Sequence, residues 1–435
     1  MIASSIGKIF LEAYNERYGA SYDARSFFME VFYPLFFDQQ KYMMTAGNSP
    51  LENGPKISCS GMILGKKPFE TPEQRRIRFN KFIVKVDSSE AEESIARGYY
   101  SLDVNATTSG QVTNLTLPIS KEDVFASWIG DALGVGVQGG LSIMFNDKRI
   151  LLDIYDGWKL YREALNSISR LNGNKINAWN GQWIAHYYDS RTYSPESPMA
   201  GFNPFVTDTS GLLNIDTISW TKVLIGLSRR YTSIQVLGYV YSIGQTNTTI
   251  GFIPFNLDQI RKPGMLYRKY FGMDSGRNAE SLWGTEYGFR TSCCNGVIGI
   301  RAMEPKGLKP YIEEKGKIPK KPKEEQIINY NVYKIWILAM LNNESLWGLS
   351  LELAELLNVN SRDIEKSIST KRKNLVESVL GACNKKQFVS AITELAPCVE
   401  DKDALRSIVK EIHEMPSDNV PYFLTLMKFQ YVTMQ

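Results

Sequence analysis

The sequence predicts an α+β protein in which an irregular mixed α/β body is followed by a C-terminal helical bundle. Residues 1–303 alternate helical and extended patterns, whereas residues 326–435 show helical periodicity throughout. Between them lies a segment, residues 304–325, with seven lysines, four prolines and few apolar residues. Because such a segment buries too little surface to offset its lost conformational entropy, we expect it to be a linker between two domains.

Length and composition narrow the class of protein. With 435 residues the chain exceeds the size of a typical single core, and its content of 43% apolar and 22% charged residues is ordinary for a globular protein. No stretch approaches the roughly 18 uncharged apolar residues that span a bilayer, and the first residues do not resemble a targeting peptide. We therefore expect a cytoplasmic protein without a membrane partner.

Histidine and cysteine usage limits the available chemistry. The chain has two histidines, His186 and His413, and five cysteines without CxxC spacing. Zinc sites and histidine-based hydrolase centres need more imidazole or thiolate ligands than these. The sequence therefore predicts no disulfide framework, no metal site and no other cofactor.

Three helices of the body have ends that the sequence identifies. Apolar residues at helical spacing near the start predict a first helix that stops at Gly19. Thr71 and Gln74 form a capping-box sequence at the start of a second helix. Ser120, with Asp123 three residues later, starts a third.

The remaining parts of the body alternate in type. In chain order we expect an inward-packing apolar segment over 26–37, a hairpin or exposed loop over 97–119, a glycine-rich turn over 134–140, a strand over 141–145, a strand that ends at Asp156, a helix near 156–170, and a helix or strand followed by one or two strands over 220–255. The aromatic stretch over 179–198 has few aliphatic residues, so we expect it to lie outside the core.

The bundle is predicted from helical periodicity and from its caps. The expected helices are 326–341, 345–357, 361–383, 385–396, 402–414 and 420–433. Asp401 precedes one of them as a cap, and Pro421 lies in the first turn of the last.

The helix that begins at Pro72 is the clearest electrostatic feature. Its apolar residues fall on one face, and the basic residues Arg75, Arg78, Lys81 and Lys85 share a neighbouring face. The candidate phosphate-binding residues are Arg75, Arg76, Arg78, Lys81 and Lys85. Because positioned cations displace counterions from a polynucleotide, this ridge is a candidate nucleic-acid contact. A solvated helix face explains the pattern equally well, and both interpretations stay open.

Two further segments are candidates for ligand contact. Residues 134–140 match GxGxxG, but the dinucleotide fingerprint needs a strand before the glycines and a helix after them, and here that order is reversed. Gln138 and Gly139 in this loop are candidates for a base edge or phosphate, although a plain helix-to-strand turn is the favoured interpretation. Arg268 and Lys269 alternate with aromatic residues, a pattern typical of base stacking, although core packing of those aromatics is favoured.

One group of residues is a candidate for metal-dependent catalysis by carboxylates. Asp153 and Asp156 with Lys159 have the acid and lysine content of metal-dependent nucleases. The D…ExK order of such enzymes is absent, so the sequence indicates no catalytic residues.

At this level of organisation the chain resembles the large subunit of type I CRISPR-Cas effector complexes (Cascade). The resemblance covers the whole chain as architecture, and its local support is the tail, KKQFVSAITELAP followed by ALRSIVKEIHEMPSDNVPYFLTLMKFQYV. It implies a non-catalytic subunit that recognises a protospacer-adjacent motif on double-stranded target DNA, aids strand separation and recruits a helicase-nuclease. The implied partners are CRISPR RNA, target DNA, the other Cascade subunits and the helicase-nuclease.

Family members read the motif with polar or glycine-bearing loops. By type of loop, the resemblance points to Asn105, Ser109, Gly110 and Gln111, or to Gln138 with Gly139. Two other functions remain open: a standalone metal-dependent nuclease of anti-phage defence or DNA processing, and a structural assembly protein that binds no nucleic acid.

Overall fold

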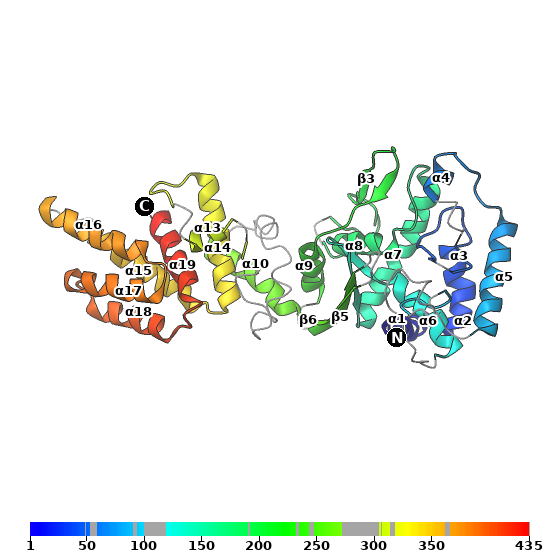
Figure 1. Cartoon of the computed structure of the whole chain (residues 1–435), viewed down its shortest axis with the longest axis horizontal. Helices are drawn as coiled ribbons and strands as arrows, with labels where there is room; N and C mark the ends of the chain where they lie inside the picture. The colour runs from blue at the N-terminus through cyan, green and yellow to red at the C-terminus, as the bar shows by residue number, and fades with distance from the viewer. Residues whose placement is uncertain are drawn as a thin grey trace. The chain divides into compact units, whose positions relative to one another are not determined.

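The computed structural model divides the chain into two compact units, Met1–Asp258 and Gln259–Gln435 (Figure 1). It describes residues 1–47, 49–52, 59–89, 94–99, 119–189, 192–231, 235–242, 248–271, 304–305, 307–313, 318–361 and 366–434. Of the residues that it describes, 61% are helical and 8% lie in strands, with small sheets and a C-terminal helical region. The predicted α+β class is therefore confirmed.

The first unit contains helices and two small sheets. Its helices are α1 (Ile2–Tyr18), α2 (Ala24–Phe27), a π-helical turn (Phe28–Phe32), α3 (Tyr33–Phe36), α4 (Cys59–Ile63), α5 (Pro72–Ser88), α6 (Lys121–Ala132), α7 (Lys148–Ser167), α8 (Ile176–Tyr187) and α9 (Trp220–Arg230). Its strands are β1 (Val135–Val137), β2 (Leu141–Phe145), β3 (Phe205–Thr207), β4 (Leu213–Ile215), β5 (Gln235–Ser242) and β6 (Thr248–Asn256). Helix α10 (Leu257–Phe271) follows β6.

The predicted helix ends are confirmed by their capping bonds. Gly19 ends α1 in the left-handed conformation, with a φ of 62°. Thr71 and Gln74 exchange the two hydrogen bonds of a capping box at the start of α5. Ser120 and Asp123 do the same for α6.

Two glycines let α1 and α6 pack backbone to backbone. A Cβ atom added at Gly7 would overlap the carbonyl oxygen of Ala126, and one added at Gly130 would overlap that of Ala3. The absence of a side chain at both positions therefore sets the distance between the two helices.

The larger sheet is antiparallel throughout, with strand order β1-β2-β5-β6. Ile143 pairs with Val240 across β2 and β5, and both side chains are fully buried. Beyond them, the ring centroids of Phe145 and Phe255 lie 6.1 Å apart in the same core. Of the alternatives expected over 220–255, a helix or strand followed by one or two strands, the structure has a helix and two strands, α9, β5 and β6.

The prediction that a strand ends at Asp156 is wrong, because this residue lies in the middle of α7. The helix begins at Lys148, where the Asp147 carboxylate accepts hydrogen bonds from the backbone of Arg149 and Ile150. Gly157 does not break the helix because it faces the indole of Trp183, and an added Cβ would lie 2.5 Å from Trp183 Cδ1.

The expectation that the aromatic stretch 179–198 lies outside the core is wrong for its first part. Trp179 and Trp183 lie on α8 with exposed fractions of 0% and 1%. Their indole N–H groups donate to the carbonyl oxygens of Gly157 and Asp153 on α7. Tryptophan therefore replaces aliphatic residues in this part of the core, with its polar atom satisfied by helix backbone.

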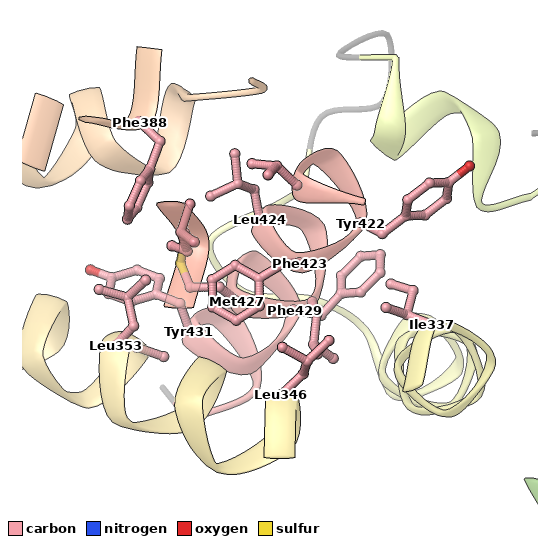
Figure 2. Packing of buried hydrophobic residues seen from close by; sticks show 14 of the residues in the cluster. Ile337, Leu346, Leu353, Phe388, Tyr422, Phe423, Leu424, Met427, Phe429 and Tyr431 are labelled. Carbon is pink, nitrogen blue, oxygen red and sulfur yellow. The ribbon is translucent and has the colours of Figure 1, made fainter. Parts of the chain in front are cut away.

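The elements of the second unit are all helices, as far as the structure describes it. Its elements after α10 are α13 (Lys309–Ile312), α14 (Glu324–Leu341), α15 (Ser345–Ser361), α16 (Lys366–Gly381), α17 (Lys385–Leu395), a 3₁₀ turn (Ala396–Cys398), α18 (Lys402–Glu414) and α19 (Val420–Thr433). Figure 2 shows α19 side chains such as Phe423 and Met427 between those of α14, α15 and α17. The stacked rings of Tyr330 and Phe429, 4.5 Å apart, join α14 to α19.

The lysine- and proline-rich segment differs from the solvated linker that we expected. Leu308 is fully buried and Ile312 is 8% exposed, both in the core of the second unit. Tyr311 packs edge-on against Tyr330 and Phe429. These few apolar residues, at helical spacing in α13 and at the residue before it, are enough to fix this part of the segment, and the unit already begins at Gln259. The boundary at residue 303 stays a prediction.

Candidate nucleic-acid interface

Helix α5 buries the apolar face that its sequence predicts. Phe82 and Val86 are 0% and 1% exposed, and Phe82 stacks on Phe28 at 5.5 Å. Phe79 stacks on Tyr33 with ring centroids 4.0 Å apart. The basic residues of α5 are thereby fixed relative to this face.

The basic ridge is not a continuous surface, because two of its arginines point into the protein. The Arg75 side chain is 10% exposed, and its Nε lies 2.9 Å from Asp38 Oδ1. Arg78 forms a two-pronged ion pair with Glu70 and also donates to Tyr42 Oη. The side chains of Arg78 and Glu70 are 16% and 13% exposed. These arginines hold the loop before α5 against the core.

We predict that Arg78→Gln lowers the free energy of unfolding by about 1–2 kcal/mol, because it leaves the Glu70 carboxylate without its cation at a mostly buried position. Urea unfolding of the full chain measures this change. Arg76→Gln, on the exposed side of the same helix, is the matched control and should change stability by less than about 0.5 kcal/mol. Equal stability of Arg78→Gln and the wild type would contradict the structural role.

The exposed part of the ridge is smaller. Arg76 and Lys81 are exposed, and Lys85 is half-buried with its Nζ 2.5 Å from Ser94 Oγ. Ile77 and Val84 lie on this outer side with exposed fractions of 55% and 64%. They line, with Asn80, Lys81, Lys85 and Ser88, a shallow groove of about 510 Å³. Among the candidate residues of α5, the exposed cations are therefore Arg76 and Lys81.

The expected glycine-rich turn over 134–140 is corrected, because residues 135–137 form strand β1 and only residues 138–140 form a turn, which joins β1 to β2 and not a helix to a strand. Gln138 and Gly139 are exposed, and Gly139 has a φ of 90° that favours glycine. The backbone of Gln138 is fixed at both ends: its N–H donates to Ile218 O, and its carbonyl accepts from Trp220 Nε1. The Gln138 side chain thus projects from a rigid turn. Asn105, Ser109, Gly110 and Gln111 lie outside the described residues.

Arg268 and Lys269 lie on α10, in the second unit. Both are exposed, and Lys269 forms an ion pair with Glu344 at 3.1 Å. The neighbouring aromatics pack into the core, as the favoured interpretation predicted: Tyr267 is 2% exposed and Tyr270 stacks on Trp347 at 4.1 Å. The Tyr267 ring is therefore not available as a platform for bases, and one face of the half-buried Tyr270 ring is covered by Trp347.

The two aspartates of the nuclease alternative are engaged by other side chains. Asp153 Oδ2 accepts hydrogen bonds of 2.6 Å from the hydroxyls of Tyr188 and Tyr231. Asp156 Oδ2 accepts from both terminal nitrogens of Arg17 at 3.0 Å. Within the described ranges, no three His, Cys, Asp or Glu side chains gather as a metal site would require.

A cavity of about 490 Å³ opens beside Asp153 in the first unit, and we call it the arginine pocket. Its polar walls are Arg17 from α1, Arg149 and Asp153 from α7, Tyr187 from α8, and Arg230 and Tyr231 at the end of α9. Burial raises the pKa of Tyr187 to about 12, so its hydroxyl stays protonated at neutral pH. These residues are spread over four helices, so no local sequence pattern signals the pocket.

In the part of the chain that the structure covers, no helix is both long enough and apolar enough to cross a bilayer. No protein-family profile, curated protein or solved structure matches this chain.

Proposed function

We propose that this protein is the non-catalytic large subunit of a cytoplasmic type I CRISPR RNA-guided surveillance complex, which binds duplex DNA at a protospacer-adjacent motif. The observation that carries the proposal is the architecture, in which a mixed α/β unit precedes a helical unit with its own core. This is the arrangement that the resemblance implies. In such complexes base pairing reads the target sequence, and the protein reads only a short duplex motif.

Two surfaces of the first unit support a role in DNA binding. Arg76 and Lys81 are exposed cations of α5, suited to backbone phosphates. Gln138 projects an amide from the rigid β1–β2 turn, and an amide can pair with adenine in the major groove. Phosphate contacts would position the duplex, and the amide would contribute to its sequence preference.

The nuclease alternative has less support, because the carboxylates on which it depends are held by tyrosine hydroxyls and an arginine. A cation at Asp153 would also lie beside Arg17, Arg149 and Arg230, which repel it. The third candidate, a structural assembly protein that binds no nucleic acid, would be supported if the assembled complex binds no duplex DNA in the experiment below.

We predict that neutralising Arg76 and Lys81 together, as Arg76→Gln/Lys81→Gln, weakens duplex DNA binding by the assembled complex on the order of tenfold at about 0.15 M salt. The slope of log K against log salt should become shallower by about two, because two cations no longer neutralise phosphates. Fluorescence anisotropy with labelled duplex at several salt concentrations measures both quantities.

Arg406→Gln is the matched control, because Arg406 is 81% exposed and lies on α18 in the other unit. It should leave the affinity and the slope unchanged. If CRISPR RNA and a repeated backbone subunit do not copurify with the wild-type chain, or if duplex binding is absent, the proposal is wrong. A metal-dependent nuclease activity that disappears in Asp153→Ala would establish the alternative.

A further inference from the structure

The three arginines of the arginine pocket differ in whether a carboxylate pairs with them. Arg17 is held by Asp156, and Arg149 is held by Asp147 through Nη2 at 3.0 Å. Arg230, at the C-terminal end of α9, is exposed and has no ion-pair partner among the described residues. The pocket therefore combines two positioned guanidinium groups with a third that is free to bind an anion.

The Asp153 carboxylate supplies a hydrogen-bond acceptor to the same pocket. Both tyrosine hydroxyls donate to the same oxygen, Oδ2, at 2.6 Å. Oδ1 accepts no hydrogen bond within the described residues. Because two donors fix the carboxylate, Oδ1 has a defined position at the pocket wall and is available to a ligand N–H group.

Aromatic rings complete the lining. Tyr187 packs against Trp183 and Tyr193 at centroid distances of 5.3 Å and 4.8 Å, so its ring is held in place. The Arg149 guanidinium lies 4.8 Å from the centroid of the Tyr231 ring, which fixes both side chains. A planar group that enters the pocket therefore meets preorganised aromatic and guanidinium surfaces.

A ligand that satisfies all three features has an anionic group for Arg230, a planar ring, and an N–H donor on that ring for Asp153. We infer that the arginine pocket binds a single unpaired nucleotide, with its phosphate at the arginines and its base between Asp153 and the tyrosines. The volume of about 490 Å³ suits a ligand of this size. This inference rests on the proposed nucleic-acid function and adds a second, single-stranded contact to it.

The carboxylate gives the pocket a base preference. Asp153 Oδ1 pairs best with an exocyclic amine, as carboxylates do with N4 of cytosine. Uracil and thymine carry no such amine. Cytidine nucleotides should therefore bind more tightly than uridine nucleotides, while inorganic phosphate, which lacks the ring, should bind more weakly than either.

Calorimetric titration of the full chain with CMP, UMP and inorganic phosphate tests the inference. We expect saturable binding of CMP, at least about threefold tighter than UMP. Arg230→Gln should weaken CMP binding about tenfold, because it removes the unpaired cation from the pocket. Arg229→Gln is the matched control: Arg229 is the preceding exposed residue and does not line the pocket.

Asp153→Asn tests the base preference separately, since its amide oxygen can still accept from the tyrosines. Its amide N–H₂ then lies where Oδ1 lay and donates, so the variant should reverse the preference, with UMP bound more tightly than CMP. An unchanged melting temperature shows that the variant is folded. Absence of CMP binding, or equal weakening in Arg229→Gln and Arg230→Gln, would overturn the pocket assignment. Duplex binding that still depends on Arg76 and Lys81 would then leave the proposed function standing, whereas CMP binding without duplex binding would reject the duplex proposal alone.

Discussion

Gly7→Ala is expected to destabilise the first unit by about 3 kcal/mol, although alanine is the better helix former by about 1 kcal/mol. The added methyl group overlaps the Ala126 carbonyl oxygen, and backbone cannot rotate away as a flexible side chain can. The two helices must therefore move apart, which loosens the packing along their whole interface. Thermal and urea unfolding, followed by circular dichroism, measures the change in stability.

Gly226→Ala provides the control within the same unit. Gly226 lies in the interior of α9, and an added Cβ there meets its nearest neighbour, Tyr188 Cβ, at an ordinary 3.5 Å. Its substitution should be neutral or stabilising by up to about 1 kcal/mol. Gly130→Ala, on the α6 side of the same crossing, should resemble Gly7→Ala. If Gly7→Ala and Gly226→Ala have the same effect, the close approach of α1 and α6 is incorrect.

Lys334→Met is expected to stabilise the second unit by about 1–4 kcal/mol at neutral pH. Lys334 lies on α14 with 3% exposure, and burial lowers the pKa of its ammonium group from 10.5 to about 7. Its Nζ donates to Thr433 Oγ1 at 2.7 Å and lies 5.8 Å from the Trp347 ring centroid, and no carboxylate pairs with it among the described residues. Methionine fills a similar volume without a charge to desolvate.

The same group makes stability depend on pH. Between about pH 7 and pH 10.5 the unfolded chain binds the Lys334 proton more tightly than the folded protein does. The free energy of unfolding should therefore rise with pH across this window, and the full penalty for the buried charge applies below about pH 7. In Lys334→Met this contribution is absent, so its pH profile should be flatter than that of the wild type.

Lys410→Met separates this effect from the general removal of a lysine charge. Lys410 is 75% exposed on α18 and forms a helix-surface pair with Glu414. It should change stability by less than about 0.5 kcal/mol and leave the pH profile unchanged. If Lys334→Met is less stable than the wild type, the bond to Thr433 outweighs the cost of burying the ammonium group.

Features that depend on a few neighbouring residues were predictable. The capping boxes at Thr71 and Ser120 and the left-handed glycine at Gly19 each involve residues close in sequence, so their patterns identify them. The bundle helices follow in the same way from periodicity, although their ends shift by several residues, as at the end of α15.

The candidate site was predicted only in part. Periodicity placed Arg75, Arg78, Lys81 and Lys85 on one face of α5, but it does not distinguish an exposed cation from one that meets a carboxylate. Asp38 and Glu70, which engage Arg75 and Arg78, come from segments before the helix. The wrong expectation for α8 has a related cause, because two tryptophans are buried by contacts to α7 that no local pattern encodes.

The sequence by itself determined the α+β class, the helical C-terminal region and most helix starts, because capping and periodicity are short-range effects. Only the tertiary structure decided which cations remain exposed, that the lysine- and proline-rich segment is partly packed, and that three arginines from separate helices share one pocket. The physical reason is that burial and ion pairing depend on partners distant in the chain, and their positions are fixed only when the helices pack together.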